Sequence, residues 1–241
     1  METDRRYMTR TEAEVAQYDV GLREYMLRVY NYMASALALT GLVAYATATY
    51  AMSDPAFANL LFVSPLKWVV MLAPVGLVFF LAARVYSMSS TAAQATFWIY
   101  AGLMGLSLAS IFLVFTGQSI ARVFFITAGT FAGVSLYGYT TKRDLSGFGT
   151  FLFMGLIGIV IASVVNMFLA SSALQFAISV VGVLVFTGLT AYDTQRIKEL
   201  YDEVDASDVM GKKAIMGALT LYLDFINLFI MMLQLFGNQR Q

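Results

Sequence analysis

The chain has 241 residues, of which 59% are hydrophobic and 12% are charged, whereas a typical soluble domain is about 25% charged. Its 15 basic and 15 acidic residues cancel, so the net charge gives no indication of a nucleic-acid partner. The absence of cysteine and histidine excludes disulfides, thiolate chemistry, histidine-bound haem or zinc, and Ser-His or Cys-His catalytic pairs. These values predict an all-α membrane protein that lies in a lipid bilayer and needs no cofactor.

The first 28 residues are polar and of mixed charge, and they lack the short apolar core and cleavage site of a signal peptide. We therefore expect residues 1–28 to form a cytoplasmic N-terminal segment and residues 29–241 to form a single membrane domain. A membrane span needs about 20 mostly apolar residues, and seven segments of the chain qualify. They lie at 29–51, 66–87, 92–115, 120–140, 149–169, 173–197 and 214–236.

Lysine and arginine residues gather on one side of this predicted bundle. Twelve of the 15 fall in the N-terminal segment or in the second, fourth and sixth connections, and three fall on the opposite side. Cytoplasmic loops of membrane proteins are enriched in these residues. We therefore expect the N-terminus to lie in the cytoplasm.

Small residues four positions apart occur in two of the predicted spans. They are Ala101, Gly105 and Ala109 in the third span, and Gly129 and Gly133 in the fourth. Positions with no side chain, or with only a methyl group, let two helix backbones approach each other closely. The spacing therefore predicts close helix packing at both places.

Asp224 lies in the middle of an uncharged run, residues 214–239, that is long enough to cross a bilayer. A carboxylate at that depth is costly, so it marks a candidate functional site. Asp193, near the end of the preceding span, is the other acid that apolar sequence surrounds. Asp224 is 11 residues beyond Lys213, or about 16 Å along an ideal helix. We therefore expect both acids in the cytoplasmic half of the bundle.

Arg84 is the basic residue expected to lie near these acids. Only 16 uncharged residues separate Lys67 from Arg84, and they span about 24 Å of helix, less than the roughly 30 Å of hydrocarbon. If Lys67 and Trp68 anchor the outer end of this span, Arg84 lies at or inside the inner boundary. Its guanidinium can then pair with a carboxylate or extend to the lipid headgroups, and the sequence leaves both alternatives open.

Two carboxylates in a site of low dielectric constant do not both ionise readily, so we expect the pair to share a proton and to respond to pH as a unit. Arg84 or a hard divalent cation can stabilise the deprotonated pair, because oxygen ligands suit calcium or magnesium. Asp193 and Asp224 alone would make a weak calcium site, which suits ion passage more than storage. The alternatives are a solvent-facing helix end for Asp193 and a neutral structural acid for Asp224.

The sequence around these two acids resembles the signature of the Bax inhibitor-1 (transmembrane Bax inhibitor motif) family. The two motifs are GLTAYDTQRIK at residues 188–198 and GALTLYLDFINLF at residues 217–229. A third segment, LREYMLRVYNYM at residues 22–33, resembles the N-terminal motif of the bacterial branch. The chain lacks the basic C-terminal tail of the animal members, which favours a bacterial inner-membrane protein over a regulator of cell death.

The resemblance implies seven transmembrane helices, in which two three-helix layers enclose a central C-terminal helix. Asp224 matches the acid on the central helix and Asp193 matches its partner, and in the family the two form a di-aspartyl pH sensor. An arginine of the second span, matched here by Arg84, pairs with the sixth-span acid in the closed state. The implied activity is a pH-dependent calcium leak, with calcium as the transported ion.

The sequence is therefore compatible with two functions. One is a pH-gated calcium leak channel, and the other is a non-conducting interaction protein that modulates a membrane-bound protease, since some family members act mainly through partners. An enzyme is not expected, because a rhomboid protease needs a histidine base and a retinal protein needs a lysine in its last helix. An aspartyl intramembrane protease places its acids in Tyr-Asp and Gly-x-Gly-Asp settings. Asp193 follows Tyr192, but Asp224 follows Leu223.

Overall fold

The structure, a computed structural model, describes residues 10–240, and it describes side chains from Tyr18 onward. The first nine residues of the predicted N-terminal segment therefore lie outside the described residues. The described chain is helical, which confirms the predicted fold class. Its elements are α1 (Arg10–Ser53), α2 (Pro55–Phe62), α3 (Leu66–Arg84), the 3-10 turn η1 (Val85–Ser87), α4 (Ser90–Val114), α5 (Gly117–Thr140), α6 (Ser146–Leu169), α7 (Ser172–Glu199) and α8 (Ser207–Phe236).

Seven of these helices are long and apolar enough to cross a membrane, as the sequence predicts. They are α1, α3, α4, α5, α6, α7 and α8. Helix α1 begins at Arg10 and has no break at residue 28, so the boundary predicted there falls inside one continuous helix. Helix α2 is an addition to the prediction. Pro55 starts it and the Asp54 carboxylate caps it by accepting hydrogen bonds from the N–H groups of Ala56 and Phe57.

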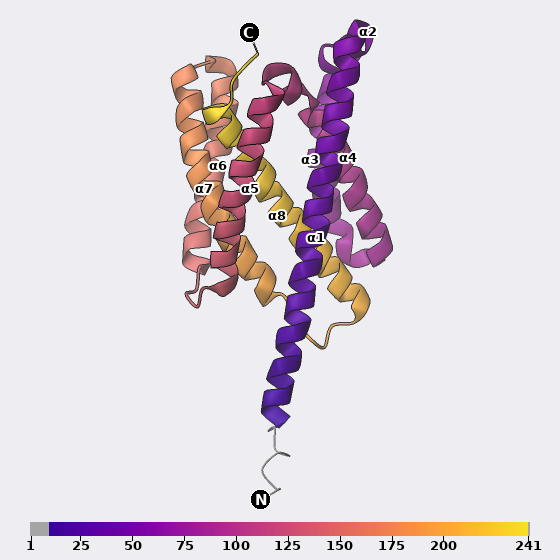
Figure 1. Cartoon of the computed structure of the whole chain (residues 1–241), viewed down its shortest axis with the longest axis vertical. Coiled ribbons are helices and arrows are strands. Elements are labelled where there is room, and N and C mark those ends of the chain that lie inside the picture. Colours follow the sequence, from indigo (N-terminus) through magenta and orange to yellow (C-terminus); the bar gives the residue numbers. More distant parts are fainter. Residues whose placement is uncertain (1–9, 241) are drawn as a thin grey trace, which may run out of the picture.

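The spanning helices form two layers with α8 between them (Figure 1). Helices α1, α3 and α4 pack together on one side, and α5, α6 and α7 pack together on the other. Helix α8 runs diagonally between the layers and contacts α1, α4, α5 and α7. This is the two-layer arrangement with a central C-terminal helix that the family resemblance implies. Its consequence for Asp224, which α8 carries, is a position in the interior of the protein.

The two series of small residues have different surroundings. Ala101, Gly105 and Ala109 are buried, and a Cβ at Gly105 would overlap the backbone oxygen of Thr40, so α4 packs closely on α1 as predicted. Gly129 and Gly133, in contrast, are exposed, and a Cβ at either position would meet no atom within 4 Å. The predicted packing role of that pair is therefore wrong. Spacing places residues on one face of a helix, but it does not tell which face meets protein.

Helix α7 makes close contacts with its neighbours at three other glycines. A Cβ at Gly138 of α5 would overlap the carbonyl oxygen of Ala191. A Cβ at Gly149 of α6 would overlap the ring of Tyr192, and one at Gly188 of α7 would overlap the side chain of Leu152. These contacts let α5 and α6 hold the backbone of α7 at residues 191–192, directly beside Asp193.

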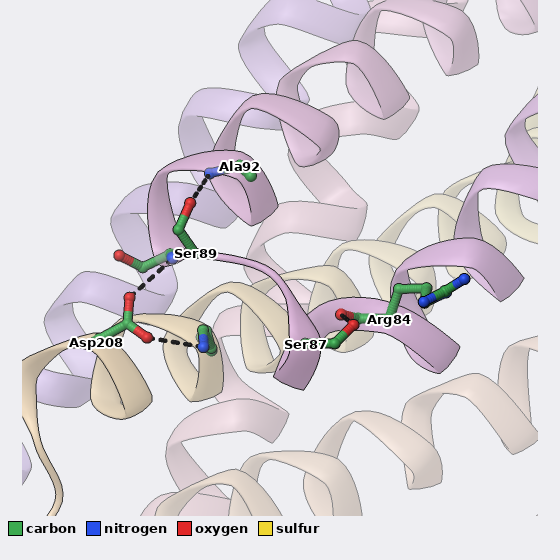
Figure 2. A network of polar contacts seen from close by, with 7 residues as sticks. Arg84, Ser87, Ser89, Ala92 and Asp208 are labelled. Atoms are coloured by element: carbon green, nitrogen blue, oxygen red, sulfur yellow. Dashed lines mark hydrogen bonds and ion pairs between the residues drawn. The ribbon is translucent and has the colours of Figure 1, made fainter.

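Polar contacts fix both ends of α8. At its first turn, Asp208 accepts a hydrogen bond from the backbone N–H of Ser90 at 2.9 Å and forms an ion pair with Lys212 at 2.7 Å, which ties α8 to the start of α4 (Figure 2). Beyond its last turn, the N–H of Arg240 donates to the carbonyl oxygen of Val114, and the N–H of Thr116 donates to that of Asn238. The central helix is thus held at each end by the connections around it.

Candidate functional site

Asp193 and Asp224 line one cavity of about 480 Å³ between α6, α7 and α8. The other polar side chains around it are Arg196, Thr220 and Asn227, with Thr150 and Tyr192. Most of the remaining wall is apolar. The apolar side chains of this wall are those of Phe153, Leu156, Phe186, Leu189 and Leu223, and Gly149 completes it.

The helical repeat explains why α8 presents polar groups to this cavity. Thr220, Asp224 and Asn227 follow one another at intervals of four and three residues, so they lie on the same face of the helix. Tyr222 faces elsewhere, since its hydroxyl lies 2.7 Å from the Thr40 hydroxyl of α1. Of these two polar neighbours of Asp224, Asn227 lines its cavity and Tyr222 does not.

The carboxyl groups of Asp193 and Asp224 line the same cavity and are near enough for their charges to interact. Asp224 is only 5% exposed, and its Oδ2 atom has no hydrogen-bond partner among the described residues. Asp193, one helix away and nearer the end of its span, is partly buried. Two carboxyl groups in this position can share a proton, which gives one of them a donor that it otherwise lacks.

Arg84 does not lie with these acids, so the pairing with Asp193 implied by the family resemblance is absent from this structure. Its side chain is exposed and points away from Asp208, and the carbonyl oxygen of Arg84 accepts a hydrogen bond from the Ser87 hydroxyl (Figure 2). The ion pairs among the described side chains are Lys212–Asp208 and Lys213–Asp205. The reason lies in the layers, because α3 packs on α4 and α7 belongs to the layer on the other side of α8.

Residues 22–241 match the family model described as "Inhibitor of apoptosis-promoting Bax1". The chain belongs to the Bax inhibitor-1 family. The match covers the cavity and all seven spanning helices except the start of α1. The resemblance suggested by the two acid-centred motifs is therefore confirmed over most of the chain.

Several bacterial proteins are similar to this Bax inhibitor-1 family member along nearly their whole length. Inner membrane protein YbhL of Escherichia coli strain K12 is 49% identical over 229 residues, which cover 94% of this chain and 96% of YbhL. A protein of Rickettsia prowazekii is 48% identical over 230 residues, which cover 95% of this chain and 96% of that protein. A protein of Caulobacter vibrioides is 47% identical over 233 residues, which cover 92% of each chain. Together with the seven apolar helices, these relatives identify a bacterial membrane protein.

In this family member, the basic side chain at the cavity is Arg196, which the sequence did not predict as a site residue. Arg196 lies three residues after Asp193 on α7, so both side chains are on one face of the helix, and their charges interact. The signal was present in the sequence, because residues three apart on a helix are neighbours. It was missed because Arg84 matched the arginine of the family.

The donor set of the cavity fits a weakly held hard cation. Two carboxylates and the side-chain oxygens of Thr220 and Asn227 face the same space, and such oxygen ligands suit calcium. The Asn227 side-chain N–H donates to the carbonyl oxygen of Leu223 at 2.8 Å, which leaves its amide oxygen free. Among the described residues, no group of three or more acidic, histidine or cysteine side chains could hold a metal ion. The cavity therefore lacks the ligands of a storage site.

Proposed function

We propose that this protein is a pH-dependent calcium leak channel of the bacterial inner membrane, with the Asp193–Asp224 pair as its gate. The observation that supports this most is the meeting of the two acids in one cavity inside the helix bundle. Burying acids in a membrane protein is costly and usually marks an ion or proton pathway. A protein that only binds partners through its surface has no use for such a pair.

The pair has two charge states with different requirements. With one shared proton, the carboxyl groups attract each other and hold α7 against α8. Without that proton, two negative charges face each other in largely apolar surroundings, and they repel unless a cation lies between them. A change in pH therefore changes both the contact between the two helices and the affinity of the cavity for a cation.

Calcium suits the deprotonated state because its two charges neutralise both carboxylates. The additional oxygens of Thr220 and Asn227 can replace part of its hydration shell. A site with so few charged ligands releases the ion again, which passage through a channel requires. The excess of lysine and arginine on the side of the N-terminus supports a cytoplasmic N-terminus, and in that orientation this cavity lies toward the cytoplasmic half of the membrane.

Calcium influx into liposomes loaded with a calcium-sensitive dye tests this proposal. The purified protein is reconstituted and flux is recorded from about pH 5 to about pH 8, the range in which perturbed carboxyl groups titrate. We expect influx that exceeds that of protein-free liposomes and that varies with pH. Protein that moves no calcium at any pH would overturn the proposal and leave the interaction protein that modulates a membrane-bound protease.

Replacing Arg196 is expected to shift the pH dependence of the flux, whereas replacing Arg84 is not. A nearby cation favours the ionised form of a carboxyl group, so Arg196→Gln should move the midpoint to higher pH by up to about one unit. Arg84→Gln is the matched control, because it removes the same charge from an exposed side chain that has no carboxylate partner among the described residues. The measurement is the midpoint of the flux–pH curve for both variants. A shifted midpoint for Arg84→Gln alone would instead support the pairing of Arg84 with Asp193 that the family resemblance implies.

A further inference from the structure

A second, larger cavity lies on the opposite side of α8 from the two acids. It is a groove of about 820 Å³ between α1 and α5, and Phe225 of α8 forms part of its floor. Phe225 is the residue after Asp224, so neighbouring residues of α8 face the two cavities. The proposed calcium pathway makes no use of this groove.

The groove is long and narrow. Its walls run from Arg23 to Ala38 on α1 and from Tyr139 back to Phe124 on α5, so each wall covers about 22 Å at 1.5 Å per residue. A groove of this length can take an extended hydrocarbon chain.

The walls offer almost no polar group to an occupant. Alanines line both sides, namely Ala34 and Ala38 on α1 and Ala128 and Ala132 on α5, and they keep the groove open. The Tyr30 hydroxyl lies 2.6 Å from that of Ser135, which in turn lies 2.9 Å from that of Thr194, so these polar groups satisfy one another. A flexible hydrocarbon chain matches such a surface, because it brings no polar group that needs a partner.

One end of the groove, in contrast, carries positive charge. Arg23 lines that end with an exposed side chain. Beside it, the Lys198 ammonium donates a hydrogen bond to the carbonyl oxygen of Tyr139 at 2.9 Å and lies 5.3 Å from the centre of its ring. Neither cation forms an ion pair with an acid among the described side chains. Glu24, the neighbour of Arg23, lines a different groove with Trp98 of α4.

We propose that the α1–α5 groove binds one acyl chain of an anionic phospholipid, with the lipid phosphate at Arg23 and Lys198. Arg23 lies in the first half of α1, and Lys198 lies in the last turn of α7 against Tyr139 of α5, both on the basic side of the protein. The length fits, since a chain that starts at the headgroups reaches about 15 Å into one leaflet, within the 22 Å of the groove. This proposal is independent of calcium transport.

The test is native mass spectrometry of the full chain in detergent, with phosphatidylglycerol or phosphatidylcholine added with identical acyl chains. Each basic residue near a membrane surface is worth about a fivefold preference for an anionic lipid. We therefore expect the protein to retain one phosphatidylglycerol with about a 25-fold preference over phosphatidylcholine. Inorganic phosphate should not displace it, because it has no acyl chain. Equal retention of both lipids, or displacement by phosphate alone, would overturn the proposal.

Two pairs of variants distinguish binding of the acyl chain from binding of the lipid headgroup. Ala132→Trp fills the groove and should reduce lipid retention at least tenfold, whereas Ala121→Trp, on an exposed part of α5 outside the groove, should not. Arg23→Gln should lower the preference for phosphatidylglycerol about fivefold. Arg122→Gln, an exposed arginine at the other end of α5, should leave it unchanged.

The alternatives have distinct outcomes in the same spectra. If Ala132→Trp and Ala121→Trp retain lipid equally, the groove is not the site and the proposal fails. A dimer that Ala132→Trp dissociates would identify a second copy as the occupant and would equally overturn it. If Ala132→Trp does not fold, the comparison of Arg23→Gln with Arg122→Gln still tests the proposal, because both substitutions change only surface charge.

Discussion

Asp224→Asn is expected to remove most of the pH dependence of the calcium flux. Asparagine has nearly the volume of aspartic acid and mimics its protonated form, so the cavity keeps its shape while the pair loses its shared proton. Asp193 is then left as a single acid near a neutral amide, without the like-charge repulsion that makes the response steep. We expect the ratio of flux at the two ends of the pH range to fall to about one, because the response requires both carboxyl groups of the pair.

Two acids outside the cavity serve as controls for this variant. Glu203 is exposed in the α7–α8 connection, so Glu203→Gln should leave the flux–pH curve unchanged. The N–H of Ser146 donates to the Asp144 carboxylate at 2.8 Å and keeps the pKa of Asp144 below its usual value, so Asp144 stays ionised throughout the assay. Asp144→Asn should therefore alter no pH-dependent step. A wild-type curve for Asp224→Asn would show that the pair is not the pH sensor.

Gly138→Ala is expected to destabilise the protein strongly although it adds only one methyl group. The added Cβ would overlap the carbonyl oxygen of Ala191, which belongs to the backbone of α7 and cannot rotate away. Relief requires α5 and α7 to move apart, and overpacking of this kind costs about 1–3 kcal/mol or more. Because Ala191 lies two residues before Asp193, the same movement should also disturb the acid pair.

Gly133→Ala is the matched control on the same helix. A Cβ at Gly133 meets no atom within 4 Å, and alanine is the better helix former by about 1 kcal/mol. The thermal midpoint of each purified variant in detergent, compared with the wild type, provides the measurement. We expect a clear decrease for Gly138→Ala and none for Gly133→Ala. Equal midpoints for the two variants would contradict the close contact of α5 with α7.

The sequence was sufficient for the features that depend on composition and on position along the chain. Each spanning helix has its own apolar run of about 20 residues, so each could be recognised without its neighbours. Asp224 could be singled out in the same way, because a lone acid in such a run needs no structural context to be unusual. The two acid-centred motifs identified the family, and with it the central position of α8.

The errors concern the direction in which a residue points around the bundle. Loop charges place Arg84 on the same side of the membrane as Asp193, but they do not reveal that α3 and α7 belong to different layers. Gly129 and Gly133 have the right spacing on a face that meets no protein, whereas the close contact at Gly138 is made by a single glycine without a partner four residues away. The α1–α5 groove left no trace in the sequence, because it depends on two helices staying apart.

A double-mutant comparison of the two acids tests the central claim most directly. Calcium influx is measured across the same pH range for the wild type, Asp193→Asn, Asp224→Asn and the double variant. If the two carboxyl groups act as one unit, either single substitution already flattens the flux–pH curve, and the second adds no further change in pH dependence. Single variants that each retain part of the pH response, with effects that add in the double variant, would show two independent acids and contradict the shared gate.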